Sequence, residues 1–223
     1  MKSNLFLRVI IGLFLFLWTC PLHAQNVAEE EAKEWVVTQG QKLLNVFGEP
    51  NLVKKYTELD EMMVQSIDLD YVAKFVMGKY WRQMDDSQKQ MYQNIFKRYA
   101  LSIYKSFPLD FETNHINFEI TKVVPEDKKT TVKAKINLQP PSPDKTSPIN
   151  DIFVDFILHK QDEKIKIIDL KLGESSLILS YRSRFYEMIA QDDDDIVWFL
   201  EDLSDITEAA ERTNRQKLEQ AEY

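Results

Sequence analysis

The sequence predicts an α+β domain in which one four-stranded antiparallel sheet has helices packed on one face, enclosing an apolar pocket. Three observations support this fold class. Hydrophobic residues recur at helical spacing before Pro108, alternate with polar residues from Ile116 to Leu172, and return to helical spacing after Ser175. Helices, then strands, then helices is the order of an α+β domain, and 223 residues suit a single one.

The N-terminal segment has the features of an export signal. Lys2 and Arg8 precede an uncharged apolar run at residues 9–18, and Ala24 offers a small residue for cleavage. The run is too short for a bilayer, which needs about twenty apolar residues. We therefore expect 1–24 to be a signal peptide, 25–207 the folded domain and 208–223 a polar C-terminal tail. A buried N-terminal helix and a lipidated Cys20 remain alternatives.

Four helices are predicted before the strands. The first covers residues 26–47 with an apolar stripe, is ended by Gly48-Glu49-Pro50, and is followed by a shorter helix to about Asp60. Asp68 is a plausible N-cap for the third helix, and Asp85 with Gln88 has the capping-box pattern for the fourth. The stripe of the first helix is Ala28, Ala32, Trp35, Val36, Leu43, Val46 and Phe47.

Period-two alternation predicts the four strands. It gives each strand one apolar and one polar face, which is typical of an antiparallel sheet open to water on one side. A turn at Pro125-Glu126-Asp127 and a tight turn at Gln161-Asp162-Glu163 connect strand pairs. The apolar positions are Ile116, Phe118 and Ile120; Val132, Ala134, Ile136 and Leu138; Ile152, Val154, Phe156 and Leu158; and Ile165 to Leu172.

Two helices close the chain. Ser175 or Ser176 is expected to cap the first, and the acidic run Asp192–Asp195 to favour the N-terminus of the second. The apolar period is lost from Glu208, so we expect a solvated or frayed tail there.

Charge and composition exclude several classes of function. The net charge is −8, and removing Lys2 and Arg8 with the signal peptide makes it more negative. Nucleic-acid binding needs a basic face and is not expected. Cys20 is the single cysteine, so the processed chain would have no thiol for a disulfide, a nucleophile or a metal site.

Residues for catalysis are scarce. His115 and His159 lie in or beside predicted strands, and Asp169 interrupts an apolar strand. Each is better explained by a structural role than by acid–base chemistry. The run Asp192–Asp195 lacks the spaced ligands of a calcium loop. We expect no catalytic residue, no metal site and no cofactor, and an apolar surplus that suits a binding pocket.

Two segments resemble the MlaC family, also called the toluene-tolerance family of periplasmic phospholipid-binding proteins. The first is Phe75-Val76-Met77-Gly78-Lys79-Tyr80-Trp81-Arg82, followed by Gln88, Phe96 and Tyr104. The second is Asp169, Ser176-Leu177-Ile178, Tyr181-Arg182-Ser183 and Phe185. The resemblance covers nearly the whole processed chain.

The resemblance implies a soluble lipid shuttle in the periplasm. Its ligand would be a phospholipid, and its partners an outer-membrane lipoprotein complex and an inner-membrane ABC transporter with an MCE domain. Residues 25–207 would then form a lipid-binding domain. We expect the acyl chains to be lined by Val72, Phe75, Val76, Phe96, Tyr99, Ile103, Phe118, Ile136, Val154, Phe156, Leu177 and Tyr181.

Two other functions remain open. One is a small periplasmic enzyme that uses Asp169 or a strand histidine as its acid–base group. The other is a structural adaptor with a filled interior. Lys79, Arg82, Arg182 and Arg184 flank the two segments, and they suit either a docking patch or a site for a lipid phosphate.

Overall fold

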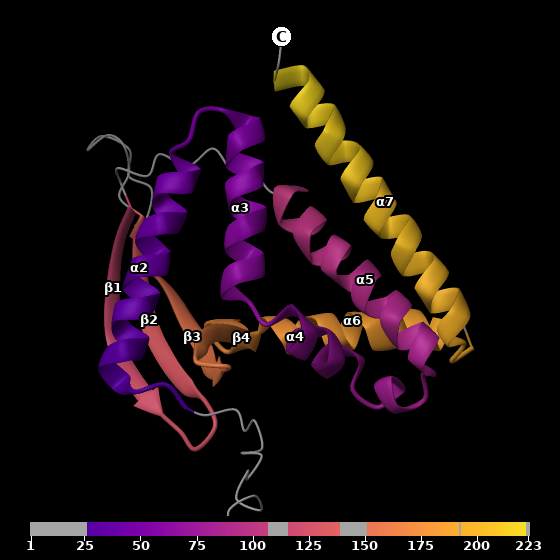
Figure 1. Ribbon diagram of the computed structural model, residues 1–223, viewed down its shortest axis with the longest axis horizontal. Coiled ribbons are helices and arrows are strands. Elements are labelled where there is room, and N and C mark those ends of the chain that lie inside the picture. The colour runs from indigo at the N-terminus through magenta and orange to yellow at the C-terminus, as the bar shows by residue number, and fades with distance from the viewer. Residues whose placement is uncertain (1–25, 107–115, 139–150, 192, 222–223) are drawn as a thin grey trace, which may run out of the picture.

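The computed structural model describes residues 26–106, 116–138, 151–191 and 193–221 (Figure 1). The predicted signal peptide, His115, Asp192 and the proline-containing loop at 139–150 lie outside these residues. The elements in chain order are α2 (Glu29–Phe47), α3 (Leu52–Ser66), α4 (Leu69–Met77), a 3-10 turn η1 (Tyr80–Arg82), α5 (Asp86–Ile103), η2 (Tyr104–Ser106), β1 (Ile116–Pro125), β2 (Thr130–Leu138), β3 (Asp151–Gln161), β4 (Lys164–Leu172), β5 (Ser175–Ser176), α6 (Leu177–Gln191) and α7 (Ile196–Ala221).

The predicted helix starts are confirmed by their caps. The Asp68 carboxylate accepts the backbone N–H of Tyr71 at 2.9 Å. At the start of α5 the Asp85 side chain accepts the N–H of Gln88, whose side chain accepts the N–H of Asp85 in return. The helix expected to end near Asp60 continues to Ser66.

The antiparallel sheet is confirmed, with one strand more than expected. Its order is β1-β2-β3-β4-β5, so each strand pairs with its neighbour in sequence. The fifth strand is the short segment Ser175–Ser176, which we expected only to cap a helix. Ser176 does both, because its hydroxyl also accepts the N–H of Leu179 at 3.2 Å. The β3–β4 turn needs left-handed backbone at Asp162 and Glu163 (φ 49° and 61°), as in a type I′ hairpin.

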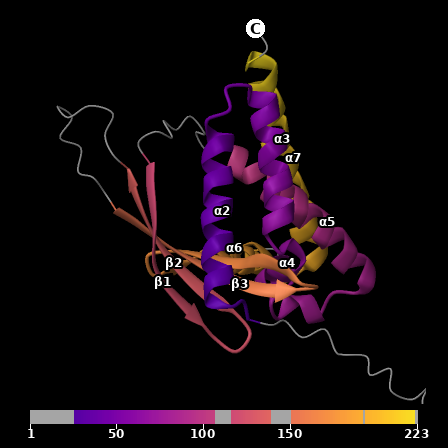
Figure 2. The ribbon, with the colours of Figure 1, turned by 60° about the vertical axis from the view of Figure 1, so that its left-hand side comes forward.

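The α2–α3 hairpin covers one face of the sheet (Figures 1 and 2). Leu158 of β3 packs there with Ala32 and Val36 of α2. Its neighbour His159 points to the opposite face, because side chains alternate along a strand. On that face His159 contacts Asp68 at the start of α4. Helices therefore also contact the second face of the β3–β4 half of the sheet.

The start of α2 is tied to the sheet by backbone contacts of a buried residue. Val27 is fully buried. The Thr130 hydroxyl accepts its N–H at 3.1 Å and donates to its carbonyl at 2.6 Å. The chain is therefore ordered within a few residues of the expected cleavage site after Ala24.

The second half of the molecule is a filled helical core. Helices α4, α5, α6 and α7 pack around Phe185, which is fully buried. Its ring lies 5.3–6.4 Å from those of Phe96, Tyr99, Tyr181 and Phe199. Such aromatic pairs favour edge-to-face and tilted packing.

Residues 208–221 are helical, not the frayed tail that the lost apolar period suggested. Polar contacts with α5 replace the missing apolar stripe. Glu211 forms a bidentate ion pair with Arg98, and the buried Asn214 amide donates to the Ser102 carbonyl at 2.9 Å. Within the described ranges, every helix is too short or too polar to cross a bilayer.

Candidate functional site

A cavity of about 280 Å³ lies between α2, α3 and the sheet. Its wall is almost entirely carbon, and its size is near the lower end of small-molecule pockets, roughly 300–1,000 Å³. The lining residues are Trp35, Val36, Gln39, Gly40, Leu43, Leu44, Phe47, Leu59, Met62, Met63, Ser66, Ile67, Ile116, Phe118, Ile136, Phe156, Ile167 and Leu170.

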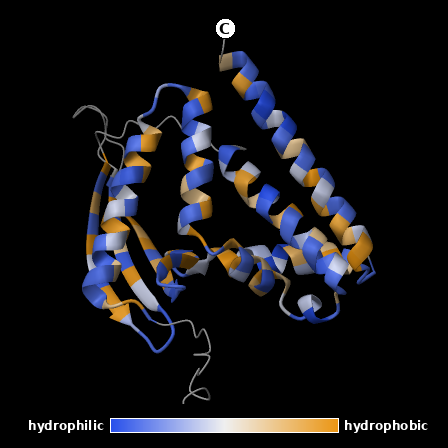
Figure 3. Cartoon of the chain, in the orientation of Figure 1, coloured by the Kyte–Doolittle hydropathy of each residue, from blue (hydrophilic) through white to orange (hydrophobic). Residues whose placement is uncertain are grey.

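Helical and strand periodicities together build this wall. On α2 the lining positions Val36, Gly40, Leu43 and Phe47 repeat every three to four residues, so they share one helix face. The lining positions of α3 follow the same spacing. On the sheet, Phe118 and Ile136 are register partners, and alternation turns both toward the helices. Figure 3 shows this alternation as changes of colour along the strands.

Three of the twelve predicted lining residues border this cavity: Phe118, Ile136 and Phe156. Val154 is buried in the sheet between Ala134 and Leu172 and is not part of the cavity wall. Leu177, at the start of α6, is 43% exposed.

The other predicted residues lie in the helical half. Val72, Val76, Phe96 and Tyr99 are buried in the helical core, and Phe75, Ile103 and Tyr181 pack against it. Whether any of these twelve side chains contacts a lipid stays a prediction.

Sequence reasoning missed the lining residues of α2 and α3. A signal for them was present, since the predicted stripe of the first helix already contained Trp35, Val36, Leu43 and Phe47. In α3 the spacing of Leu59, Met62, Met63 and Ser66 carries the same information. The two family-like segments drew attention to the helical half instead.

Those segments have a structural role. The Arg182 guanidinium donates to the Phe75 carbonyl at the end of α4 and stacks 3.9 Å from the Phe75 ring centroid. The Tyr186 hydroxyl accepts the N–H of Lys79 at 2.9 Å. Gly78 has φ +50°, and a Cβ there would collide with that hydroxyl, so the position requires glycine. Arg182 is therefore engaged in joining α6 to α4.

The acidic turn before α7 also has structural partners. The Tyr80 hydroxyl donates to the Asp194 carboxylate at 2.5 Å, and the Asp195 carboxylate accepts the N–H of Val197 at 2.7 Å. The hydrogen bond to Asp194 and burial raise the pKa of Tyr80. This geometry agrees with the expected helix-capping role.

Two candidate acid–base residues, Asp169 and His159, are engaged in hydrogen bonds outside the cavity wall, and His115 lies outside the described residues. Asp169 accepts the Ser176 hydroxyl at 2.6 Å and the N–H of Ile178 at 3.2 Å, which anchors the start of α6. His159 Nε2 lies 2.8 Å from the Asp68 carboxylate. Burial opposes ionisation of Asp68, but the hydrogen bonds from His159 and Tyr71 leave its pKa below the ordinary value.

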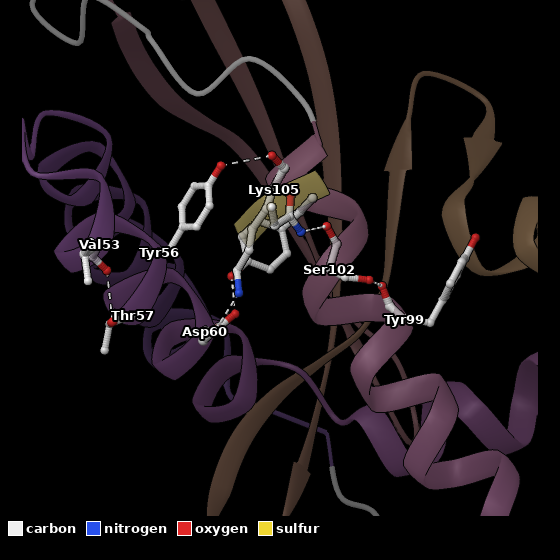
Figure 4. Close-up of polar contacts among 9 residues, drawn as sticks. Val53, Tyr56, Thr57, Asp60, Tyr99, Ser102 and Lys105 are labelled. Carbon is white, nitrogen blue, oxygen red and sulfur yellow. Dashed lines mark hydrogen bonds and ion pairs between the residues drawn. The ribbon is translucent and has the colours of Figure 1, made fainter. Parts of the chain in front are cut away.

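A polar contact holds α3 against the end of α5 (Figure 4). The Asp60 carboxylate accepts the Lys105 ammonium at 2.6 Å and the hydroxyl of Tyr104. The Tyr56 hydroxyl donates to the Lys105 carbonyl at 3.3 Å. Burial and the Asp60 contact raise the pKa of Tyr104 far above its usual range. The cavity wall is thus joined to the helical half at this point.

Charged groups gather in a second hollow, of about 300 Å³, that also borders Ile67. Lys97, Lys164 and Lys166 line it together with acidic side chains. Among the described residues, no group of three or more His, Cys, Asp or Glu could hold a metal ion.

Fold and cavity together define a class: an α+β protein with a carbon-lined cavity between a helical hairpin and an antiparallel sheet. The chain belongs to the MlaC protein family, whose pattern matches residues 41–205. The match begins inside α2 and includes α3, the whole sheet and α6. The sequence matches no curated protein sequence.

A solved structure shares this fold. It is the phospholipid-binding protein from Ralstonia solanacearum in complex with a phospholipid, with a TM-score of 0.63 and 18% sequence identity. The alignment covers 80% of this chain and 98% of that one. At this identity the likeness establishes the fold alone.

Proposed function

We propose that this protein binds a phospholipid in the cavity between α2, α3 and the sheet, as a binding protein rather than an enzyme. The observation that carries the proposal is the carbon-lined wall of that cavity in a chain of the MlaC family. The related Ralstonia protein, which was solved with a phospholipid, supports the ligand class. Asp169 and His159, two of the three candidate acid–base residues, are held in structural contacts.

The finer proposal is a soluble periplasmic shuttle between an outer-membrane lipoprotein complex and an inner-membrane MCE-domain transporter. The two acyl chains of a phospholipid contain about thirty methylenes, each worth about 0.8 kcal/mol on leaving water. Free diffusion through an aqueous compartment is therefore opposed by something on the order of 20 kcal/mol. An apolar cavity removes most of this cost. The free energy of the lipid in the protein is then close to its free energy in a membrane, so both loading and unloading can occur.

The size of the cavity constrains how lipid enters. An apolar protein cavity of about 150 Å³ holds one benzene, so a cavity of 280 Å³ holds on the order of a dozen carbons. Two acyl chains need more room than this. On our proposal the α2–α3 hairpin moves away from the sheet when lipid is bound.

One purification tests the ligand and the export together. The full chain is expressed in a Gram-negative host, recovered from the periplasm and extracted with organic solvent for mass spectrometry. We expect stoichiometric phospholipid in the extract and an intact mass that corresponds to cleavage after Ala24. Folded protein without phospholipid would contradict the binding proposal, and a chain retained in the cytoplasm with residues 1–24 intact would contradict the export proposal.

A further inference from the structure

The α2–α3 hairpin is attached to the sheet near its two chain ends. At the start of α2, the Thr130 hydroxyl is hydrogen-bonded to both backbone groups of Val27. At the end of α3, Ile67 forms a β-bridge with Ile167. The Lys166 ammonium also donates to two backbone carbonyls in the last turn of α3. The end of the hairpin that carries the connecting loop is therefore the end farther from these attachments.

A polar contact holds this farther end of α3 to the helical half (Figure 4). Tyr56 and Asp60 are one helical turn apart, and Tyr56 lies eleven residues before Ile67, which corresponds to about 16 Å of helix. The Asp60 carboxylate accepts the Lys105 ammonium at 2.6 Å and the Tyr104 hydroxyl. The Tyr56 hydroxyl donates to the Lys105 carbonyl at 3.3 Å. The contact therefore joins α3 to η2 at a distance from the attachment at Ile67.

The helical half holds Lys105 in place from its own side. Lys217 of α7 donates to the Lys105 carbonyl at 2.9 Å. Asn214, one turn earlier in α7, donates to the carbonyl of Ser102, one turn earlier in α5. Both α7 residues lie beyond residue 205, where the match to the family ends. The partner of α3 is thus positioned by a part of α7 outside the family match.

The same segment of α3 presents carbon to the cavity. Leu59, Met62 and Met63 line the cavity on the helix face next to the one that carries Asp60. Apolar contacts are not directional, so this wall does not by itself fix one position of α3. The Lys105 and Asp60 side chains are 14% and 36% exposed. Water can therefore replace their hydrogen bonds when the two groups separate, which makes the contact reversible.

We propose that Asp60, Tyr104 and Lys105 form a latch that keeps the α2–α3 hairpin closed in lipid-free protein and that releases before a phospholipid enters. This inference rests on the proposed function and adds to it the step that controls loading. The latch lowers the population of the open state that accepts lipid, and it lowers the apparent affinity by the same factor. Once lipid holds the hairpin open the latch is already broken, so it has no influence on how fast lipid leaves.

Breaking the latch should speed loading and leave release unchanged. The full processed chain is mixed with phosphatidylcholine vesicles that contain a self-quenched fluorescent phosphatidylcholine, and uptake by the protein is followed as a rise in fluorescence. Asp60→Asn keeps the shape of the side chain and removes its charge. We expect it to load roughly three to ten times faster than the wild type. Release from loaded protein to unlabelled vesicles should keep the wild-type rate.

Two matched substitutions separate the latch from charge and from stability. Glu61→Gln removes a charge from the exposed neighbouring residue of α3. Asp155→Asn breaks a comparable ion pair, in which Lys133 Nζ lies 2.9 Å from the carboxylate, on the sheet face opposite the cavity. Both variants should load lipid at the wild-type rate. Faster loading by either one, or unchanged loading by Asp60→Asn, would overturn the latch and leave phospholipid binding intact.

A second experiment fixes the latch shut. A processed chain that begins at Gln25 contains no cysteine, so Asp60→Cys combined with Lys105→Cys provides two unique thiols for a short bis-maleimide cross-linker. We expect the cross-linked protein to load at least tenfold more slowly than the same variant before cross-linking. Equal rates would overturn the latch even if Asp60→Asn does not fold. If the wild type takes up no lipid, the proposed function fails and the latch with it.

Discussion

The two halves of the molecule use their apolar side chains in different ways. In the helical half, rings from α4, α5, α6 and α7 close around Phe185 and leave it fully buried. In the sheet half, α2 and α3 approach the strands but leave a cavity of about 280 Å³. Aromatic rings occur in both halves, so ring content does not explain the difference; in the cavity wall Gly40 contributes no side chain beside the Phe118 ring. An apolar stripe in a sequence therefore does not distinguish a filled interior from a hollow one.

The largest expected effect is a difference in the loss of stability between a side chain in the filled helical core and one in the cavity wall. Phe185→Ala should lower the free energy of unfolding by about 3–5 kcal/mol, because it removes a ring that five other rings contact. Met62→Ala should cost less than about 2 kcal/mol, since its side chain already borders empty space. Urea unfolding of lipid-free protein measures both. Equal losses would mean that the cavity is filled in solution.

The second comparison enlarges one side chain that is buried outside the cavity and one that lines it. Val154→Trp should destabilise the protein by about 1–3 kcal/mol, because Val154 is buried against its strand partners outside the cavity. Leu43→Trp should stay within about 1.5 kcal/mol of the wild type but lose bound phospholipid, since the indole takes the space of the ligand. Thermal unfolding and lipid extraction distinguish the two variants. A Leu43→Trp protein that keeps its full lipid content would place the ligand elsewhere.

The smallest effect concerns a single methyl group. A Cβ at Gly40 would lie 3.5 Å from the Phe118 ring, which is ordinary van der Waals contact. Gly40→Ala should stabilise lipid-free protein by about 0.5–1 kcal/mol, because glycine is unfavourable inside a helix. Lys42→Ala, at an exposed position of α2, controls for helix propensity alone. A loss of stability in Gly40→Ala would show that α2 and β1 are packed more tightly than the cavity implies.

The elements that could be predicted from the sequence have local causes. The caps at Asp68 and Asp85 form between residues three apart in the chain, so spacing alone indicates them. Strand alternation likewise identified the sheet face to which Phe118, Ile136 and Phe156 belong. The fifth strand was missed because two residues are too few to show a period. The helix at 208–221 was missed because polar contacts with α5, distant in sequence, hold it.

By itself the sequence determined the α+β class, the antiparallel sheet and the resemblance to the MlaC family, because periodicity, caps and short motifs are read within a few residues. Only the tertiary structure decided which apolar stripes meet without filling the space between them. It placed Arg182 on the Phe75 carbonyl and paired Gln39 with Ser66 across two helices. Whether a face is filled depends on the shapes of side chains that meet from distant segments, and such contacts leave no period along the chain.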